Sequence, residues 1–260
     1  NINVELTATE RCGIKQYTFP KAEAAIFLNL KKAMNWDFTQ NSYIEVLDSV
    51  TVRGYRFSDG WARNQRIYFH TRFSKPFTRT ELDTTAIFKD EKQIGTAYIA
   101  RFDFTTKENE QILVCTGISG VSMEGAAQNL KTEVPENNFQ KYLASTQNKW
   151  NKELGKIEIE TTDKDARTNF YTALYHSMIA PTIYDDVDCS YFGPDRKVNQ
   201  TNGWTNYTTF SLWDTYRAAH PLFTYTAPNR VNDIVKSFIA FYEQNGRLPV
   251  WNFYASETNM

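Results

Sequence analysis

The spacing of apolar residues changes near residue 120, and this change constrains the fold more than any other feature of the sequence. Before it, apolar and polar residues alternate, as in Ile2, Val4, Leu6 and Ala8. Such alternation turns one face of a strand toward a core and the other toward water. Runs of this kind predict strands at 2–8, 14–19, 24–30, 43–47, 50–57, 66–73, 96–104 and 111–118.

Turn signals such as Ser58-Asp59-Gly60 separate the predicted strands. Many short strands with regular turns are typical of an antiparallel sandwich. We therefore predict a β-sandwich domain over 1–120. The chain opens on Asn1, without a starting Met and inside a strand pattern, so we expect the N-terminal part of this domain to be missing.

After residue 120 the apolar residues follow a helical spacing. Residues 138–154 have the pattern of an amphipathic helix, and Lys156–Glu160 has that of one short strand. Ser122-Met123-Glu124-Gly125 loosely fits a capping pattern at the start of another helix. We predict a helical linker over 121–160.

Residues 161–260 combine helices with long loops. We expect helices from an N-cap at Asp163 to before Pro181, from Thr209 to His220 with a stop at Pro221, and from Asn229 to Gln244 with a stop at Asn245-Gly246. Long loops fill 184–206 and 248–260. This alternation is typical of an α/α barrel, whose loops at one end build the site. We predict that 161–260 is the first part of such a barrel, which is truncated.

Composition narrows the range of partners. The formal net charge is −1, so we expect no nucleic acid partner. No apolar run reaches the roughly 18 residues of a membrane span.

Aromatic residues make up 15%, and their rings stack on the C–H faces of sugars. Cys12, Cys115 and Cys189 indicate neither a disulfide framework nor a zinc site.

Two segments have the side chains of a carbohydrate site. In the first, Trp213 can stack on one face of a sugar while Asp214 grips two hydroxyl groups. The alternative is that Trp213 belongs to the core and Asp214 pairs with Arg217 on one helix face. In the second, Glu257 follows Trp251, Asn252 and Tyr254. Its alternative is that Ser256 and Glu257 cap a following helix.

Asp185, Asp186 and Asp188 form an acidic cluster with the hard oxygen ligands that calcium prefers. The spacing departs from a calcium loop because Cys189 and Ser190 occupy positions of ligands and glycine, and we favour a solvated loop. The histidines are scattered, and no zinc-protease, serine-hydrolase or phosphate-loop motif is present.

Several stretches follow one another in the order and spacing of a known family. They are Trp61-Ala62, Ser119-Gly120-Val121-Ser122 with Gly125-Ala126 and Asn129-Leu130, Phe170–His176, Ser211–Arg217, and Leu248-Pro249-Val250-Trp251 with Glu257-Thr258. Together they resemble glycoside hydrolase family 92, the calcium-dependent exo-acting α-mannosidases. The resemblance implies an N-terminal β-sandwich, a helical linker and an (α/α)6 barrel. It also implies inverting release of terminal mannose, with α-1,2-linked mannosides of N-glycans or mannan as substrates.

The sequence departs from this family in its length. Family members have several hundred residues, and their general acid, general base and calcium motif lie beyond Met260. We therefore assign no catalytic residue to this segment, and expect Ca²⁺ to be bound mainly by residues outside it. The resemblance implies substrate binding by Asp214 and Glu257 and, more weakly, by Trp213 and Arg217. It places the acidic loop at Asp186 and Asp188 at the border of the sugar pocket, with Asp186 as a further substrate-binding residue.

Three further expectations follow from the resemblance. The partners are a mannose-containing oligosaccharide and the remainder of the same polypeptide. The location is periplasmic or secreted, in a bacterium, because polymeric glycans are degraded outside the cytoplasm. Two other functions remain open: an (α/α)6 hydrolase or phosphorylase acting on α-glucosides, and a non-catalytic carbohydrate-binding fragment.

Overall fold

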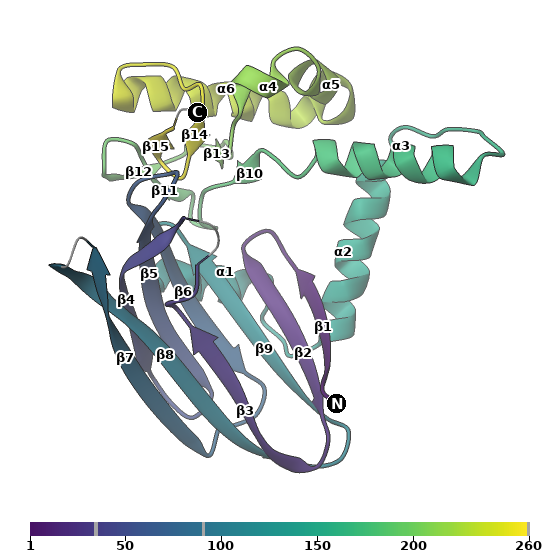
Figure 1. The fold of residues 1–260 in the computed structure, drawn as a ribbon. Helices are drawn as coiled ribbons and strands as arrows, with labels where there is room; N and C mark the ends of the chain where they lie inside the picture. The colour runs from purple at the N-terminus through teal and green to yellow at the C-terminus, as the bar shows by residue number, and fades with distance from the viewer. Residues whose placement is uncertain (34–35, 90–91, 259–260) are drawn as a thin grey trace. The chain divides into compact units, whose positions relative to one another are not determined.

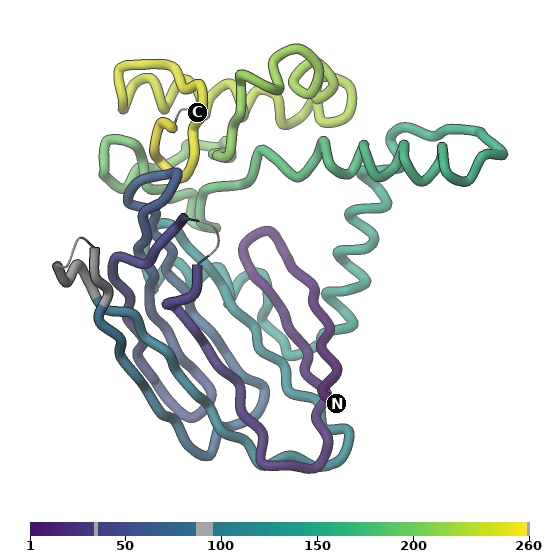
Figure 2. Tube along the Cα trace, in the orientation of Figure 1, coloured from purple at the N-terminus to yellow at the C-terminus, as the bar shows by residue number. Residues whose placement is uncertain are grey.

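The computed structural model describes residues 1–33, 36–89 and 92–258, which form two compact units (Figure 1; Figure 2). Unit 1 comprises Asn1–Leu143 and the short segment Asp186–Asp188. Unit 2 comprises Ala144–Asp185 and Cys189–Met260. An antiparallel β-domain is thus followed by helices, which confirms the predicted fold class at this level.

Unit 1 is built on two antiparallel sheets (Figure 1). The larger sheet has the order β1 (Asn3–Ala8), β2 (Cys12–Phe19), β9 (Glu110–Ser119), β6 (Gln65–Phe73), β5 (Thr51–Asp59) and β4 (Phe38–Val46). The smaller sheet has the order β3 (Ala22–Asn29), β8 (Lys92–Thr106) and β7 (Arg79–Lys89). The alternating residues predicted from the sequence supply the core between them, with Phe102 and Phe104 fully buried.

A second core lies on the opposite face of the larger sheet. Helix α1 (Met123–Glu133) packs on β9 and β6 there. Cys12, Ile14, Leu130, Val134 and Phe139 belong to this cluster. The predicted cap is confirmed, because the Ser122 hydroxyl accepts a hydrogen bond from the Gly125 amide at 2.9 Å. Alternate residues of β2 and β9 therefore serve two cores, one on each face of the sheet.

Unit 2 contains the remaining helices and three short strand pairings. Its helices are most of α2 (Phe139–Leu154), then α3 (Lys164–Ser177), α4 (Leu212–Thr215), α5 (Ala219–Thr226) and α6 (Pro228–Asn245). The paired strands are β10 (Thr182–Ile183) with β13 (Tyr207–Thr208), β11 (Ser190–Phe192) with β12 (Val198–Gln200), and β14 (Asn252–Phe253) with β15 (Ser256–Glu257). The hydrophobic core of the second half of this unit is formed by Tyr207, Phe210, Phe223 and Ile234.

Two helix boundaries in unit 2 agree with the capping signals. Asp163 is the N-cap of α3 and accepts hydrogen bonds from the Asp165 and Ala166 amides. Gly246 ends α6 in the left-handed conformation, with φ of 75°, which glycine adopts without a steric penalty.

Three element predictions were wrong. The helix expected to stop at Pro221 is broken into α4 and α5, and Pro221 lies in the first turn of α5, where a missing N–H costs no helical bond. Lys156–Glu160 forms no strand. Strand β7 was missed because residues 79–86 of this edge strand are mostly polar and exposed and show no apolar alternation. Over the described ranges, no helix is both long and apolar enough to cross a bilayer.

Candidate substrate-binding site

The two segments predicted to bind sugar are joined by main-chain hydrogen bonds in unit 2. The Phe210 amide donates to the Asn252 carbonyl at 3.0 Å, and the Leu212 amide donates to the Val250 carbonyl at 3.0 Å. Residue 212 begins α4, the single helical turn that carries Trp213 and Asp214. The chain therefore brings this turn beside the loop of Glu257, although about 40 residues separate them in the sequence.

Trp213 and Asp214 are exposed on α4, whereas Leu212 of the same turn packs against the core of unit 2. Trp213 is 68% exposed and Tyr216 is 57% exposed, so the interpretation of Trp213 as a core residue is wrong for this structure. Asp214 accepts a hydrogen bond from the Ser211 hydroxyl. Arg217 donates from Nε to the Tyr216 hydroxyl at 2.7 Å, and its guanidinium lies 5.5 Å from the centre of that ring. Asp214 and Arg217 thus have different partners rather than each other.

Glu257 lies in β15, directly opposite Asn252. Its Oε1 atom accepts hydrogen bonds from the Val250 amide at 2.9 Å and the Trp251 amide at 3.1 Å. The carboxylate remains exposed, yet these two donors fix its orientation. Residues 252–257 form a hairpin, and the helix that Ser256 and Glu257 would cap in the alternative interpretation lies outside the described residues.

Asp186 belongs to unit 1, whereas the other predicted site residues belong to unit 2. Its side chain is buried, and both carboxylate oxygens have protein donors. The Ser119 hydroxyl donates to Oδ2 at 2.6 Å, and the Asn129 amide donates to Oδ1 at 2.8 Å. The Asn129 side-chain oxygen in turn accepts from the Val187 amide at 2.9 Å. These bonds hold the segment Asp186–Asp188 against β9 and α1.

A glycine makes room for the Asp186 carboxylate. A Cβ atom at Gly125 would lie 2.3 Å from Asp186 Oδ2 and 2.9 Å from the Ser119 hydroxyl oxygen. Burial raises the pKa of Asp186, while the hydrogen bonds from Ser119 and Asn129 oppose that rise. Three residues of the sequence motif 119–130 thus surround one acid, and this contact gives Asp186 an evident structural role.

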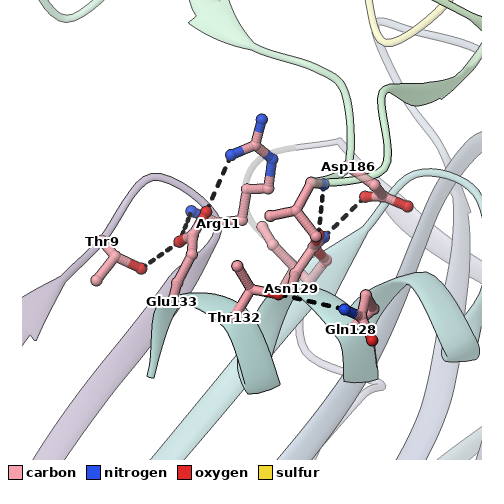
Figure 3. Close-up of polar contacts among 9 residues, drawn as sticks. Thr9, Arg11, Gln128, Asn129, Thr132, Glu133 and Asp186 are labelled. Atoms are coloured by element: carbon pink, nitrogen blue, oxygen red, sulfur yellow. Dashed lines mark hydrogen bonds and ion pairs between the residues drawn. The ribbon is translucent and has the colours of Figure 1, made fainter. Parts of the chain in front are cut away.

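The other end of α1 is held by a second acid (Figure 3). Glu133 accepts hydrogen bonds from the Thr9 hydroxyl at 2.5 Å, the Arg11 amide at 2.9 Å and the Arg11 guanidinium at 2.9 Å. This attaches the turn between β1 and β2 to the last turn of α1.

The acidic cluster does not have the donor set of a calcium site. Asp185 and Asp186 are buried, so the prediction of a solvated loop was wrong for these two residues. Asp185 Oδ2 accepts from the Asn206 amide at 2.8 Å, and both oxygens of Asp186 are engaged as described. In the part of the chain that the structure describes, no group of three or more His, Cys, Asp or Glu side chains could hold a metal ion.

The structure therefore gathers Trp213, Asp214, Arg217 and Glu257 in one unit and places Asp186 in the other. Sequence reasoning missed Tyr216, whose hydroxyl positions Arg217. The signal was present, since Tyr216 lies between two singled-out residues. Sequence reasoning also missed a pair of exposed tryptophans in unit 1, because Trp36 and Trp61 lie 25 positions apart and no local pattern links them.

Comparison with family models gives matches over almost all of the chain. The model described as the glycosyl hydrolase family 92 N-terminal domain matches residues 1–119. The model described as the glycosyl hydrolase family 92 catalytic domain matches residues 125–260. No curated protein matches the chain.

Comparison with solved structures gives matches to much longer chains. The family GH92 alpha-mannosidase BT3965 from Bacteroides thetaiotaomicron is 33% identical, with a TM-score of 0.89 over 98% of this chain and 36% of that one. The same mannosidase has been solved in complex with mannoimidazole. The GH92 inverting mannosidase BT2199 from Bacteroides thetaiotaomicron is 27% identical, with a TM-score of 0.82 over 96% of this chain and 34% of that one.

A more distant match reports on the fold alone. A putative kojibiose phosphorylase from the human microbiome is 12% identical, with a TM-score of 0.56 over 92% of this chain and 32% of its own. The chain thus spans about a third of the length of the solved structures that it matches.

Proposed function

The chain belongs to glycosyl hydrolase family 92, and from this premise we propose that it forms part of an inverting, exo-acting α-mannosidase. The substrates would be α-linked mannosides of N-glycans or mannan, chiefly α-1,2-linked, from which terminal mannose is released. The 33% identity to a GH92 alpha-mannosidase supports the activity. Mannoimidazole bound to that relative supports mannose as the sugar.

The observation that carries this proposal is the exposed Trp213–Asp214 turn beside the oriented carboxylate of Glu257 in unit 2. An exposed indole offers a flat apolar surface to the C–H face of a pyranose ring. A carboxylate next to it accepts hydrogen bonds from two neighbouring hydroxyl groups, and charged acceptors form the stronger bonds. These residues would bind and orient the terminal sugar.

Proton transfer is assigned to other residues. Inversion needs one carboxylic acid at the leaving oxygen and one carboxylate that activates water, about 6.5–9.5 Å apart. In our proposal both belong to the remainder of the polypeptide, as do the calcium ligands implied by the family. The calcium would help to bind and distort the sugar when present. The residues of this chain hold and orient the substrate.

The experiment uses the full-length protein with α-1,2-mannobiose. We expect release of mannose, initially as the β-anomer by NMR, and loss of release in excess EDTA that added Ca²⁺ restores. Full activity in EDTA would refute the calcium dependence, and an α-anomeric product would refute inversion. α-Glucosides, with and without phosphate, test the hydrolase or phosphorylase alternative. Binding of mannose without any turnover would favour the non-catalytic alternative.

The binding role of Asp214 has its own test. Asp214→Ala removes the carboxylate that would accept hydrogen bonds from two sugar hydroxyls. Because each hydrogen bond to a charged group contributes roughly 1.5–3 kcal/mol, kcat/KM should fall by about 100-fold or more. Asp165→Ala is the matched control, because Asp165 is an exposed acid of unit 2 in the first turn of α3. A loss below about fivefold for Asp214→Ala, or an equal loss in the control, would contradict the role.

The location of the enzyme is also a proposal. Mannan and N-glycans occur outside the cytoplasm of the organism that degrades them, so we propose a periplasmic or secreted enzyme of a bacterium. Cell fractionation with activity assays would test this, and activity confined to the cytoplasm would contradict it.

A further inference from the structure

Unit 1 presents two exposed tryptophans on adjoining loops at one end of its larger sheet. Trp36 precedes β4 and is 69% exposed, and Trp61 follows β5 and is 42% exposed. Their loops are in contact, because a Cβ atom at Gly60 would lie 2.9 Å from the Asp37 Cα atom. Gly60 directly precedes Trp61, and Asp37 directly follows Trp36. The two indole groups therefore start from neighbouring points of the backbone.

The loop that carries Trp61 is held by a set of hydrogen bonds. Asp59 accepts from the Asn64 amide through Oδ1 and from the Gln40 side chain through Oδ2, each at 2.5 Å. The Gln65 side chain donates to the Ala62 carbonyl at 3.2 Å, and the Ala62 side chain is fully buried. Trp61 is thus exposed on a loop whose next residue is anchored in the domain, so its position is built rather than incidental.

A polar pair with unused hydrogen-bonding capacity lies at the base of these loops. Arg56 Nη1 is 3.7 Å from Asp37 Oδ2 in a partly buried ion pair. Asp37 Oδ1 and Arg56 Nη2 are both buried and have no hydrogen-bond partner among the described residues. Buried polar groups normally have partners. Both atoms are buried, so a small donor and acceptor such as water suits them, whereas the Asp37 side chain as a whole is 29% exposed.

We propose that Trp36 and Trp61 form a carbohydrate-contacting surface of the β-domain that binds mannose units of an oligosaccharide or polymer. The indole rings supply stacking surfaces for C–H faces, and the partly exposed side chain of Asp37, next to Trp36 in the sequence, supplies a polar group at the edge of the surface. This inference rests on the proposed function for the identity of the sugar. It adds to that function a contact with glycan chains longer than the terminal residue.

The test compares long and short substrates in the full-length protein. Trp36→Ala, Trp61→Ala and the double variant are assayed on 4-nitrophenyl α-mannoside and on α-mannan. We expect the ratio of kcat/KM for mannan to that for the aryl mannoside to fall at least about fivefold. In affinity electrophoresis, mannan in the gel should slow the migration of the wild-type protein, and the Ala variants should lose this retardation. The Trp→Phe variants should retain part of the preference for mannan and part of the retardation, because a smaller aromatic ring still stacks on a sugar.

Phe27→Ala is the matched control, because Phe27 is a 62% exposed aromatic residue of unit 1 in β3. An unchanged ratio with unchanged retardation would overturn the proposal. A second result would also overturn the proposal: a lower Tm in both the Ala and the Phe variants together with unchanged retardation. That result would mean that another part of the polypeptide covers the two indole groups. If the protein cleaves no mannoside, the proposed function fails, whereas retardation in mannan compared with amylose still tests this surface.

Discussion

Replacement of Gly125 by Ala tests whether the contact between α1 and Asp186 stabilises the β-domain. By helix propensity alone, Ala in place of Gly should add about 1 kcal/mol to stability. The new Cβ atom would, however, lie 2.3 Å from Asp186 Oδ2 and 2.9 Å from the Ser119 hydroxyl oxygen. Asp186 must then move, and its bonds from Ser119 at 2.6 Å and Asn129 at 2.8 Å weaken or break.

The magnitude follows from these opposing terms. Hydrogen bonds to charged groups contribute about 1.5–3 kcal/mol each, so loss of one to two of them outweighs the gain from helix propensity. We expect a net destabilisation of about 2 kcal/mol. For a domain of this size that corresponds to a fall in Tm of roughly 4–8 °C, measurable by differential scanning calorimetry.

Two further variants make the result interpretable. Gly13→Ala is the control, because a Cβ atom at Gly13 meets nothing within 4 Å, and we expect it to change Tm little. In the Asp186→Ala background the clash with the carboxylate is absent, so Gly125→Ala should cost at least about 1 kcal/mol less than in the wild type. An equal or higher Tm for Gly125→Ala in the wild-type background would refute the reasoning.

Two predictions concern ionisable side chains. Burial raises the pKa of Asp186 above its ordinary value of 3.8. The folded state therefore binds this proton more tightly than the unfolded state does. As a result, the free energy of unfolding falls as pH rises from about 4 through the raised pKa. Asp186→Asn should flatten this part of the Tm–pH curve, and an unchanged slope would contradict the assignment. Burial, with the nearby Glu133 carboxylate, raises the pKa of Cys12 to about 12, whereas Cys189 is exposed. Iodoacetamide at about pH 8 should therefore modify Cys189 first, as read by peptide mass spectrometry, and faster labelling of Cys12 would show that the second core opens.

Asp186 shows how far sequence reasoning reaches in the candidate site. Ser119, Gly125 and Asn129 stand out as parts of a motif, and Asp186 as part of an acidic cluster. Nothing in the sequence connects the two groups, because Asp186 lies 67 positions from Ser119 and 57 from Asn129. The fold brings them together in a buried contact, and the place of Asp186 at the border of the sugar pocket stays a prediction.

Trp213, Asp214 and Glu257 illustrate the opposite case. Their residue types suit a sugar site without excluding a structural role, and the substrate-binding role stays a prediction. The structure adds that the main chain of 210–212 pairs with that of 250–252 and that two amides orient Glu257. In place of the Asp214–Arg217 pair of the alternative interpretation, it shows contacts of Asp214 to Ser211 and of Arg217 to Tyr216.

The order of the elements can be predicted from local sequence patterns, since alternation, helical spacing and capping act over a few residues. These patterns thus predicted the β-domain, the cap at Ser122, the N-cap at Asp163 and the helix stop at Gly246. Which residues these elements bring into contact depends on how they pack in three dimensions. The edge strand β7, the break between α4 and α5, and the burial of Asp186 depend on contacts between residues far apart in the chain. Those contacts form only after the sheets and helices have packed, so no local pattern records them.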